Sequence, residues 1–427
     1  MNKLKIVSLV AMLAFAATVS SQNSTNSPYT RYGYGAIADQ SYAAQRGMGG
    51  IGYGLKKRTI INPLNPASCS EVDSLTFMFE LGLSGQYAWF DEYGKKASGL
   101  NGNIAYLAMQ FRLMRNLGIG AGMEPLSYVG YQYGDTGRLT QGDQEPYTKS
   151  YEGSGGLNRI YGTIGYKFSD RLSFGTKIAY LYGDVFHNLI FNNTTPGANH
   201  TIQSDTLRTS GITLDLGLQY SFPVGKNHLL TIGAVYTPKI SFNGEYRYGK
   251  YLANNSTGET KMDSLYSTSK NVFQMPESYG AGVTFTQFNK YTFGADVLYQ
   301  RWSDAMFYDM TGQLNDRLKI NAGGEIIPNV MTNNLLKRIR YRAGASYSNS
   351  YIKVNNESSG NKAAGYKEYG VNIGFGFPMV DRRSFINVAF EYSKIVPEQK
   401  QLLSEQYLKM TVSYTFNEMW FYKQKLK

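Results

Sequence analysis

The chain has 427 residues, among them 46 Gly, 36 Tyr and 22 Phe, and carries 43 Lys and Arg against 31 Asp and Glu. Its single cysteine, Cys69, excludes an intramolecular disulfide, and its three scattered histidines lack the spacing of a metal site. A formal charge of +12 often indicates nucleic acid, but an exported chain more readily meets anionic lipid headgroups or lipopolysaccharide. We therefore expect no metal, no cofactor and no nucleic-acid partner.

Residues 1–21 have the pattern of a secretory signal peptide. Lys3 and Lys5 give a basic start, an apolar run follows from residue 6 to residue 19, and Ser20 and Ser21 supply small residues for cleavage. The apolar run is shorter than the roughly 20 residues of a spanning helix, although a membrane anchor is the alternative. We expect cleavage after Ser21, and no later run is apolar enough for a transmembrane helix.

Residues 22–74 are rich in Gly, Ser and Asn and have no strand periodicity. The glycines of 47–54 superficially look like a dinucleotide loop, but no strand precedes them and no helix follows, so we reject that interpretation. We expect them to allow tight packing. The segment either hangs in the periplasm or folds into the lumen of a barrel as a plug.

Alternation with a period of two begins near residue 75 and recurs to residue 416. In 408–416 every second residue is apolar, from Leu408 through Met410 to Phe416, and the residues between them are polar. One strand of this kind has one apolar and one polar face, and many long ones in a Tyr- and Gly-rich chain predict a transmembrane barrel. We predict fourteen strands, at 75–90, 101–114, 117–133, 156–168, 171–186, 207–222, 227–248, 272–288, 291–308, 317–327, 338–351, 366–378, 384–396 and 406–416.

The connections between these strands alternate in length. Two- to five-residue connections such as 115–116 and 169–170 alternate with long polar ones, which we expect near 134–155, 187–206, 249–271 and 352–365. Short periplasmic turns and long outer loops are typical of outer-membrane barrels. The connection at 328–337 is longer, is expected to hold a helical turn, and leaves twelve or sixteen strands as alternatives. A soluble sandwich or propeller is the other class, but it would have shorter strands and no such rhythm.

The predicted fold class is therefore all-β: a transmembrane antiparallel barrel of about fourteen strands over 75–416, with a plug at 22–74 and a periplasmic tail at 417–427. Its third strand contains Gly118, Gly120 and Gly122 and then Pro125. Proline removes a donor from the ladder. Gly122 and Pro125 mark either a bulge near the rim or a kink that opens a gap in the wall.

Eight charged residues fall on the inward phase of their strands: the acidic Asp215, Asp296 and Glu391, and the basic Arg112, Lys177, Arg340, Arg342 and Lys409. We consider Arg112, Lys177, Arg340 and Arg342 as candidate ligand contacts. Pairing with acidic side chains and with the plug is one interpretation. The other is that they hold the carboxylate of a ligand whose apolar tail lies among apolar residues.

These features together resemble the FadL family of outer-membrane transporters. The Gly-rich segment leading into Asn65-Pro66-Ala67 is similar to the hatch motif of that family, and the total of fourteen strands agrees with it. Met275-Pro276-Glu277, followed by a hairpin that ends in Tyr299-Gln300-Arg301-Trp302-Ser303, resembles a hairpin of the family. The kinked third strand is the fourth feature, and the ending at 417–421 resembles members from Bacteroidetes.

The resemblance implies an outer-membrane protein of a Gram-negative cell, without enzymatic activity, for passive uptake of hydrophobic, fatty-acid-like molecules. Asn65, Pro66 and Ala67 would then contact the wall, and the ligand would leave sideways through the third strand. His187 and His200, expected in one outer loop, have no catalytic motif around them. The alternative is an accessory barrel of a secretion or assembly complex, which binds a periplasmic or outer-membrane partner through Trp420 and Phe421 of its tail. The sequence leaves the ligand and the oligomeric state undetermined.

Overall fold

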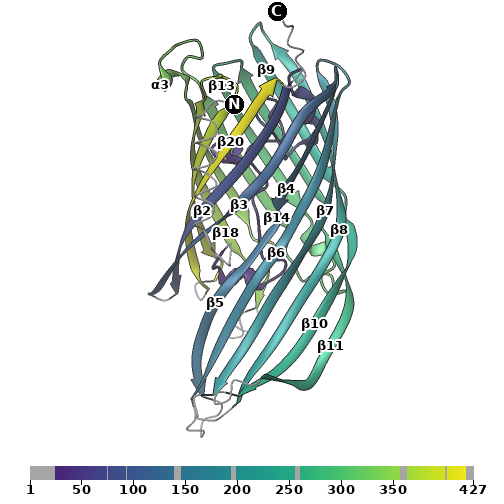
Figure 1. Ribbon diagram of the computed structural model, residues 1–427, viewed down its shortest axis with the longest axis vertical. Coiled ribbons are helices and arrows are strands. Elements are labelled where there is room, and N and C mark those ends of the chain that lie inside the picture. The colour runs from purple at the N-terminus through teal and green to yellow at the C-terminus, as the bar shows by residue number, and fades with distance from the viewer. Residues whose placement is uncertain are drawn as a thin grey trace, which may run out of the picture.

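A computed structural model of the chain describes residues 25–74, 76–92, 94–138, 146–193, 199–254, 260–355, 363–399 and 402–419. These residues form one closed antiparallel barrel, because each strand pairs with the next and the last, β20, pairs with the first, β2 (Figure 1). Three of the fourteen barrel strands are interrupted and therefore carry two labels each. The barrel strands are β2 (Thr76–Glu92), β3 (Lys95–Met114), β4 (Leu117–Pro125) with β5 (Ser127–Arg138), β6 (Pro146–Lys167), β7 (Leu172–Asn193), β8 (Asn199–Val224), β9 (His228–Thr237) with β10 (Ile240–Asn254), β11 (Thr260–Met275) with β12 (Ser278–Gln287), β13 (Tyr291–Gln300), β14 (Arg317–Ile326), β15 (Arg340–Asn349), β18 (Tyr366–Pro378), β19 (Phe385–Pro397) and β20 (Ser404–Met419).

The apolar phase of these strands points outward, as β18 illustrates. Tyr369, Val371 and Ile373 expose 50–58% of their surface, whereas Gly370 and Asn372 between them are buried. A soluble protein would bury the apolar set. The inverted pattern is that of a barrel with an apolar exterior and a polar interior. Within the described residues, no helix is both long and apolar enough to cross a bilayer.

Short connections gather at one end of the barrel, which we call the turn end. It holds the start of β2, the end of β20 and the turns at 115–116, 168–171, 225–227, 288–290 and 379–384. The connection at 327–339 lies at the same end and contains α3 (Leu335–Arg338), the helical turn expected there.

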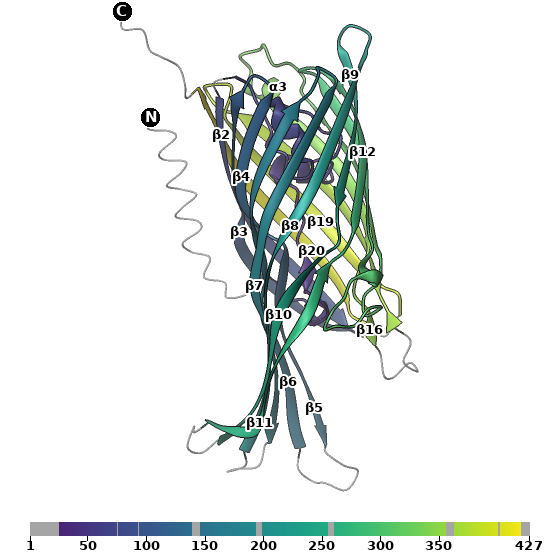
Figure 2. The same cartoon turned by 90° about the vertical axis from the view of Figure 1, so that its right-hand side faces the viewer.

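At the opposite end, six strands continue far beyond the others as a twisted sheet that we call the skirt (Figures 1 and 2). The skirt consists of those parts of β5, β6, β7, β8, β10 and β11 that extend beyond the other strands. Most of the residues expected in outer loops at 134–155, 187–206 and 249–271 are therefore strand, and only 139–145, 194–198 and 255–259 fall outside the described residues. The expectation was wrong because a strand surrounded by water on both faces has no apolar phase to reveal it. His187 and His200 accordingly lie on β7 and β8 and not in a loop.

The expected ninth strand is shorter than predicted. It ends at Gln300, and the chain then turns inward through η3 (Trp302–Asp304). Trp302 is 2% exposed and packs on Tyr34 and Tyr351, so its burial in the lumen competes with continuation of the strand. The small elements β16 (Val354–Asn355) and β17 (Ala363–Ala364) pair with each other in the connection after β15.

The N-terminal segment runs through the barrel interior, visible in purple in Figure 2, and we call residues 25–74 the plug. It contains η1 (Pro28–Arg31), β1 (Ala36–Ile37), α2 (Ala43–Arg46) and η2 (Pro66–Glu71). Most of its side chains are buried, including Tyr34, Tyr42 and Met48. The signal peptide expected at 1–21 and the tail residues Trp420 and Phe421 lie outside the described residues.

Candidate functional site

The glycines of the plug bring its backbone against the wall. Gly49 has a φ of +71°, and a methyl group built on it would lie 2.7 Å from the carbonyl oxygen of Ala322 and 2.9 Å from the backbone nitrogen of Ala345. Only glycine meets both requirements, a left-handed backbone and the absence of a Cβ. The plug therefore lies in direct backbone contact with β14 and β15.

Asn65 forms hydrogen bonds both within the plug and to the barrel wall. Its Oδ1 accepts a hydrogen bond of 3.0 Å from the backbone N–H of Ala67, which caps η2. Its Nδ2 donates to the carbonyl oxygens of Tyr53, at 2.8 Å, and of Leu218 on β8, at 3.1 Å. Pro66 lies against Gly175 of β7 and Gly217 of β8, where a side chain would collide with it. The Asn65-Pro66-Ala67 segment thus lies at the wall, fully buried.

Ion pairs also connect the plug to the barrel. Lys57 Nζ lies 2.6 Å from Glu325 on β14, and Glu325 lies 2.7 Å from Arg342 Nε on β15. Lys319 of β14 lies 3.0 Å from Asp39 of the plug. The Asp39–Lys319 pair is partly exposed, but Glu325 is buried, and removing one member of its pairs leaves the other charge in a medium that solvates it poorly. The plug is therefore held to the wall by contacts that are costly to break.

Asp39 illustrates the electrostatics of the plug. Burial disfavours its charged form, but the nearby Lys319 ammonium and Arg46 guanidinium outweigh this effect and hold the pKa of the carboxyl well below its usual range. Arg46 in turn donates from Nε to Ser41 O and from Nη1 to Thr411 Oγ1, at 2.8 and 3.0 Å. Both charges are satisfied inside the protein and remain charged at neutral pH.

Three of the four basic residues considered as carboxylate ligands are occupied by internal partners. Lys177 lies 3.3 Å from Asp215 and 3.6 Å from Glu124, and Arg340 and Arg342 both face Glu325. Arg112 is separate from this group. It lies at the turn end, where its Nη1 donates to Ser74 Oγ at 2.8 Å.

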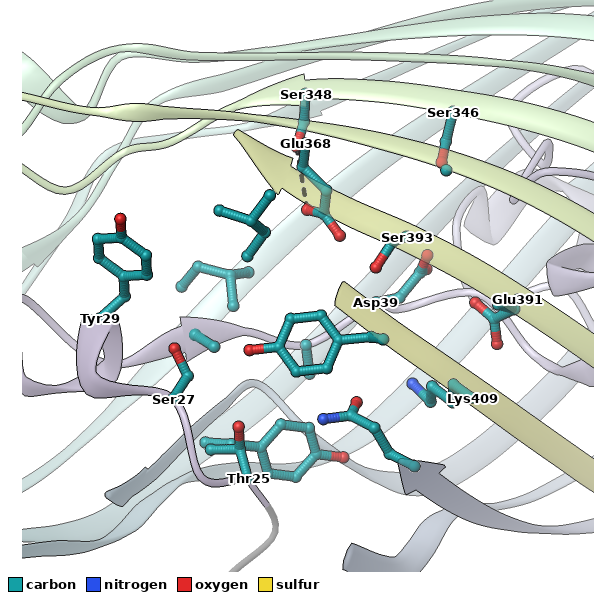
Figure 3. Close-up of a pocket in the computed structure, with 18 of the residues that line it drawn as sticks. Thr25, Ser27, Tyr29, Asp39, Ser346, Ser348, Glu368, Glu391, Ser393 and Lys409 are labelled. Atoms are coloured by element: carbon teal, nitrogen blue, oxygen red, sulfur yellow. Dashed lines mark hydrogen bonds between the residues drawn. The ribbon is translucent and has the colours of Figure 1, made fainter. Parts of the chain in front are cut away.

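Two cavities of about 190 and 150 Å³ remain between plug and wall. Figure 3 shows Asp39, Glu391 and Lys409 around the larger one, together with serines of β15 and β19. The smaller cavity adds apolar side chains such as Leu126 and Leu298 to the charges of Arg159 and Lys177. The larger cavity lacks the predominantly apolar lining that a hydrophobic ligand favours, whereas the lining of the smaller one is mostly apolar.

Aromatic side chains close the lumen toward the skirt. Tyr34 of the plug is fully buried and contacts Phe273, Trp302 and Phe307, with ring centroids 6.3, 5.8 and 4.9 Å away. Its backbone N–H donates to Tyr351 Oη at 2.9 Å. The plug and the inward turn after β13 thus form one packed cluster across the interior.

The third strand is interrupted at Leu126, directly after Pro125. Residues of β4 pair with β3 as far as Met123, and Gly122 lies within the paired part, opposite Ala108. Beyond the interruption β5 pairs with β6, and among the described pairings residues 95–106 of β3 have a partner only in β2. The ladder is therefore open beyond Pro125 and not at Gly122.

Part of the plug occupies this opening, which sequence reasoning missed. Ala36 and Ile37 of β1 pair with β5, Gly130 N–H donates to Thr30 Oγ1 at 3.2 Å, and Asn26 lies against Gly99 of β3. Two paired residues are too few to give a periodic signal. Asp296, one of the charged residues expected on the inward phase, contacts another part of the plug: its Oδ2 accepts hydrogen bonds from the backbone of Gly52 and Tyr53 at 2.5 and 2.9 Å.

Comparison with known proteins identifies the family of this chain. The sequence profile of the BamG family matches residues 1–427, the whole chain. The chain belongs to the BamG family. No curated protein matches this BamG-family member.

Solved structures similar to the BamG-family chain include a FadL homologue and two toluene transporters. A FadL homologue from Pseudomonas aeruginosa has a TM-score of 0.59 at 12% identity, over 89% of this chain and 99% of that one. The Pseudomonas putida toluene transporter TodX has 0.58 at 18%, over 91% and 99%. The Ralstonia pickettii toluene transporter TbuX has 0.54 at 14%, over 88% and 97%. At these identities the likeness concerns the fold, which is FadL-like as expected.

Proposed function

We propose that this BamG-family protein is a sealed outer-membrane barrel that acts without chemistry, as a partner-binding accessory subunit of a secretion or assembly complex. Its apolar exterior, which would contact membrane lipid and lipopolysaccharide, and its predicted signal peptide support an outer-membrane location. The turn end would then face the periplasm and the skirt the cell exterior. A Bacteroidetes origin, suggested by the resemblance of the C-terminal end, belongs to the same proposal.

The observation that carries the accessory role is the occupied lumen. The plug crosses the interior, and its contacts include Lys57 with Glu325 and Asp39 with Lys319, while aromatic rings close the skirt end. A passive channel needs a path that opens at modest cost, and several buried ion pairs make that cost high. The large skirt offers a surface for contacts outside the bilayer instead.

Affinity purification in mild detergent, followed by mass spectrometry, tests this role. Stable partners in stoichiometric amounts support it, and a barrel recovered only with lipid contradicts it. A tail deletion probes the contribution of Trp420 and Phe421. It should begin at residue 420, because Glu418 and Met419 still pair with β2 and their removal would damage the barrel seam.

A second candidate, passive uptake of a hydrophobic, fatty-acid-like molecule with lateral exit, is favoured by one observation. The ladder between β3 and β5 is open beyond Pro125, and only the first part of the plug occupies the opening. An apolar solute gains free energy by passing sideways into lipid and not into water. Gly122 and Pro125 would then serve as the hinge of the opening.

A disulfide lock tests this second role. Asn26→Cys with Gly99→Cys, in a Cys69→Ser background, would tie the plug to β3 where the two residues lie in contact. Uptake of a fluorescent fatty acid into proteoliposomes should stop on oxidation and return on reduction if the opening is the route. The single Asn26→Cys variant is the matched control. Uptake that is equally absent in every form would instead favour the sealed accessory barrel.

A further inference from the structure

A third cavity lies at the turn end, separate from the two internal ones. It has a volume of about 500 Å³ and lies between the plug and the surrounding wall, and we call it the mouth. The plug contributes Arg58 and Asp73, β3 contributes Arg112, and the turn between β18 and β19 contributes Arg382 and Arg383. The mouth thus opens toward the periplasmic side in the orientation proposed above.

Positive charge dominates the mouth. Five basic side chains line it, against only two acidic ones, Glu71 and Asp73, and both acids are already paired. The basic residues are Arg58, Arg112, Lys167, Arg382 and Arg383. Glu71 lies 3.1 Å from Lys56 and 3.5 Å from Lys167, and Asp73 lies 3.3 Å from Arg58.

Three arginines of the mouth have no carboxylate partner among the described residues. Arg112 reaches only the hydroxyl of Ser74, and its Nε is buried without a hydrogen-bond acceptor. Arg382 reaches the side-chain oxygen of Asn333 at 3.3 Å, and the structure gives the Arg383 guanidinium no ion pair. A guanidinium group presents a fork of donors that matches a carboxylate. All three line the same cavity, so their guanidinium groups can face one anionic partner.

The size and surroundings of the mouth narrow the choice of occupant. Its volume is far above the roughly 30 Å³ that one water occupies in the liquid, so a single small ion would not fill it. Lipid headgroups surround the outside of the barrel, whereas Thr76 and Asn417, which line the mouth, are buried on the lumen side. The protein's own tail continues from Met419 with Lys423, Lys425 and Lys427 and no acidic side chain, so it would repel the mouth.

We propose that the mouth binds an acidic segment of a partner protein, with several Asp or Glu side chains presented to Arg112, Arg382 and Arg383. The proposal rests on the accessory function above and adds the chemistry of the partner. Opposite charge across such a surface guides association and sets which partner is accepted.

The test uses the full-length barrel in detergent and a fluorescein-labelled peptide of alternating Glu and Ser, with a Gln-for-Glu peptide as the neutral probe. Fluorescence anisotropy should show binding of the acidic peptide only, weakened by salt. The double variant Arg382→Gln/Arg383→Gln should raise the Kd about fivefold. The matched control Lys226→Gln/Lys290→Gln removes two charges from exposed turns of the same end, outside the mouth, and should leave the Kd unchanged.

Four results would overturn the proposal. The first is an equal rise in Kd in both double variants, and the second is equal binding of the neutral and the acidic peptide. The third is displacement of the acidic peptide by phosphatidylglycerol micelles but not by neutral ones, and the fourth is tighter binding of the acidic peptide after deletion of 420–427. The third would assign the mouth to lipid phosphate and the last to the protein's own tail. The purification experiment remains separate: partners retained by the Arg382→Gln/Arg383→Gln variant would leave the accessory function intact and refute the mouth alone.

Discussion

Glu325 is the residue whose replacement most directly tests how the plug is held. It lies on β14, is 1% exposed, and its carboxylate is 2.6 Å from Lys57 of the plug and 2.7 Å from Arg342. Arg340 is a third cation, 3.9 Å away. Glu325→Gln keeps the size of the side chain and removes its charge, which leaves the buried Arg342 and the half-buried Lys57 and Arg340 without their shared counter-ion.

Breaking a buried pair by removing one partner costs about 3–5 kcal/mol, and we expect a loss of this size in the free energy of unfolding. The matched control is Asp184→Asn on the skirt. It makes the same chemical change in an ion pair in which Asp184 lies 2.9 Å from Arg208. The Arg208 side chain is 61% exposed and the Asp184 side chain 32%. Solvent screens that pair, and its loss should cost less than about 1 kcal/mol.

Guanidinium-induced unfolding of the refolded barrel in micelles measures both values. A Lys57→Met/Glu325→Gln double variant supplies the coupling: if a stranded cation is the cause, Glu325→Gln must cost less once Lys57 is gone. The reasoning is refuted if the free energy of unfolding of Glu325→Gln lies within about 1 kcal/mol of the parent value, or if the losses caused by the two substitutions are additive.

Three further predictions concern the plug itself. Asn65→Ala removes the cap of η2 and two further hydrogen bonds, and should lower the free energy of unfolding by about 1–3 kcal/mol in the same assay. Because Lys319 and Arg46 lower the pKa of Asp39 when the protein is folded, its contribution to stability is present above its unfolded pKa of about 3.9 and is lost as the pH falls toward the folded value. Between neutral and acid pH, the free energy of unfolding of Asp39→Asn should therefore depend less on pH than that of the parent. Cys69 is buried, which raises the pKa of its thiol to about 12, so maleimide labelling should be slow until the plug is displaced.

Each of these predictions has its own control. The conservative Asn65→Asp retains the capping oxygen and should recover part of the loss. An unchanged acid profile in Asp39→Asn would contradict the proposed ion pairs. For Cys69, the chain unfolded in guanidinium sets the rate of full labelling, and a folded protein that reacts as fast would show that the plug is open.

The strand pattern was visible in the sequence because a barrel wall imposes a local rule. In β18 the alternation of Tyr369, Val371 and Ile373 with small or polar residues follows from having lipid on one side and a packed interior on the other. Its bounds, 366–378, were predicted as observed. The turns of the turn end were equally local, and so was the interruption of the third strand, because proline cannot donate to a ladder.

Features that depend on residues far apart in the chain were not predictable in this way. The skirt has no apolar phase, so its strands were taken for loops. Lys57 and Glu325 are separated by 268 positions, and nothing near either residue indicates the other. The pairing of Ala36 and Ile37 with β5 is too short to leave a pattern.

The sequence by itself thus determined that the chain forms a barrel with an apolar exterior, because the period of two is a property of each strand alone. Only the tertiary structure decided that the plug fills the interior and that three arginines of the mouth have no carboxylate partner among the described residues. Those outcomes depend on which segments meet after the barrel closes: the plug brings Asp39 and Lys57 to β14, while Arg112, Arg382 and Arg383 come together from β3 and a distant turn.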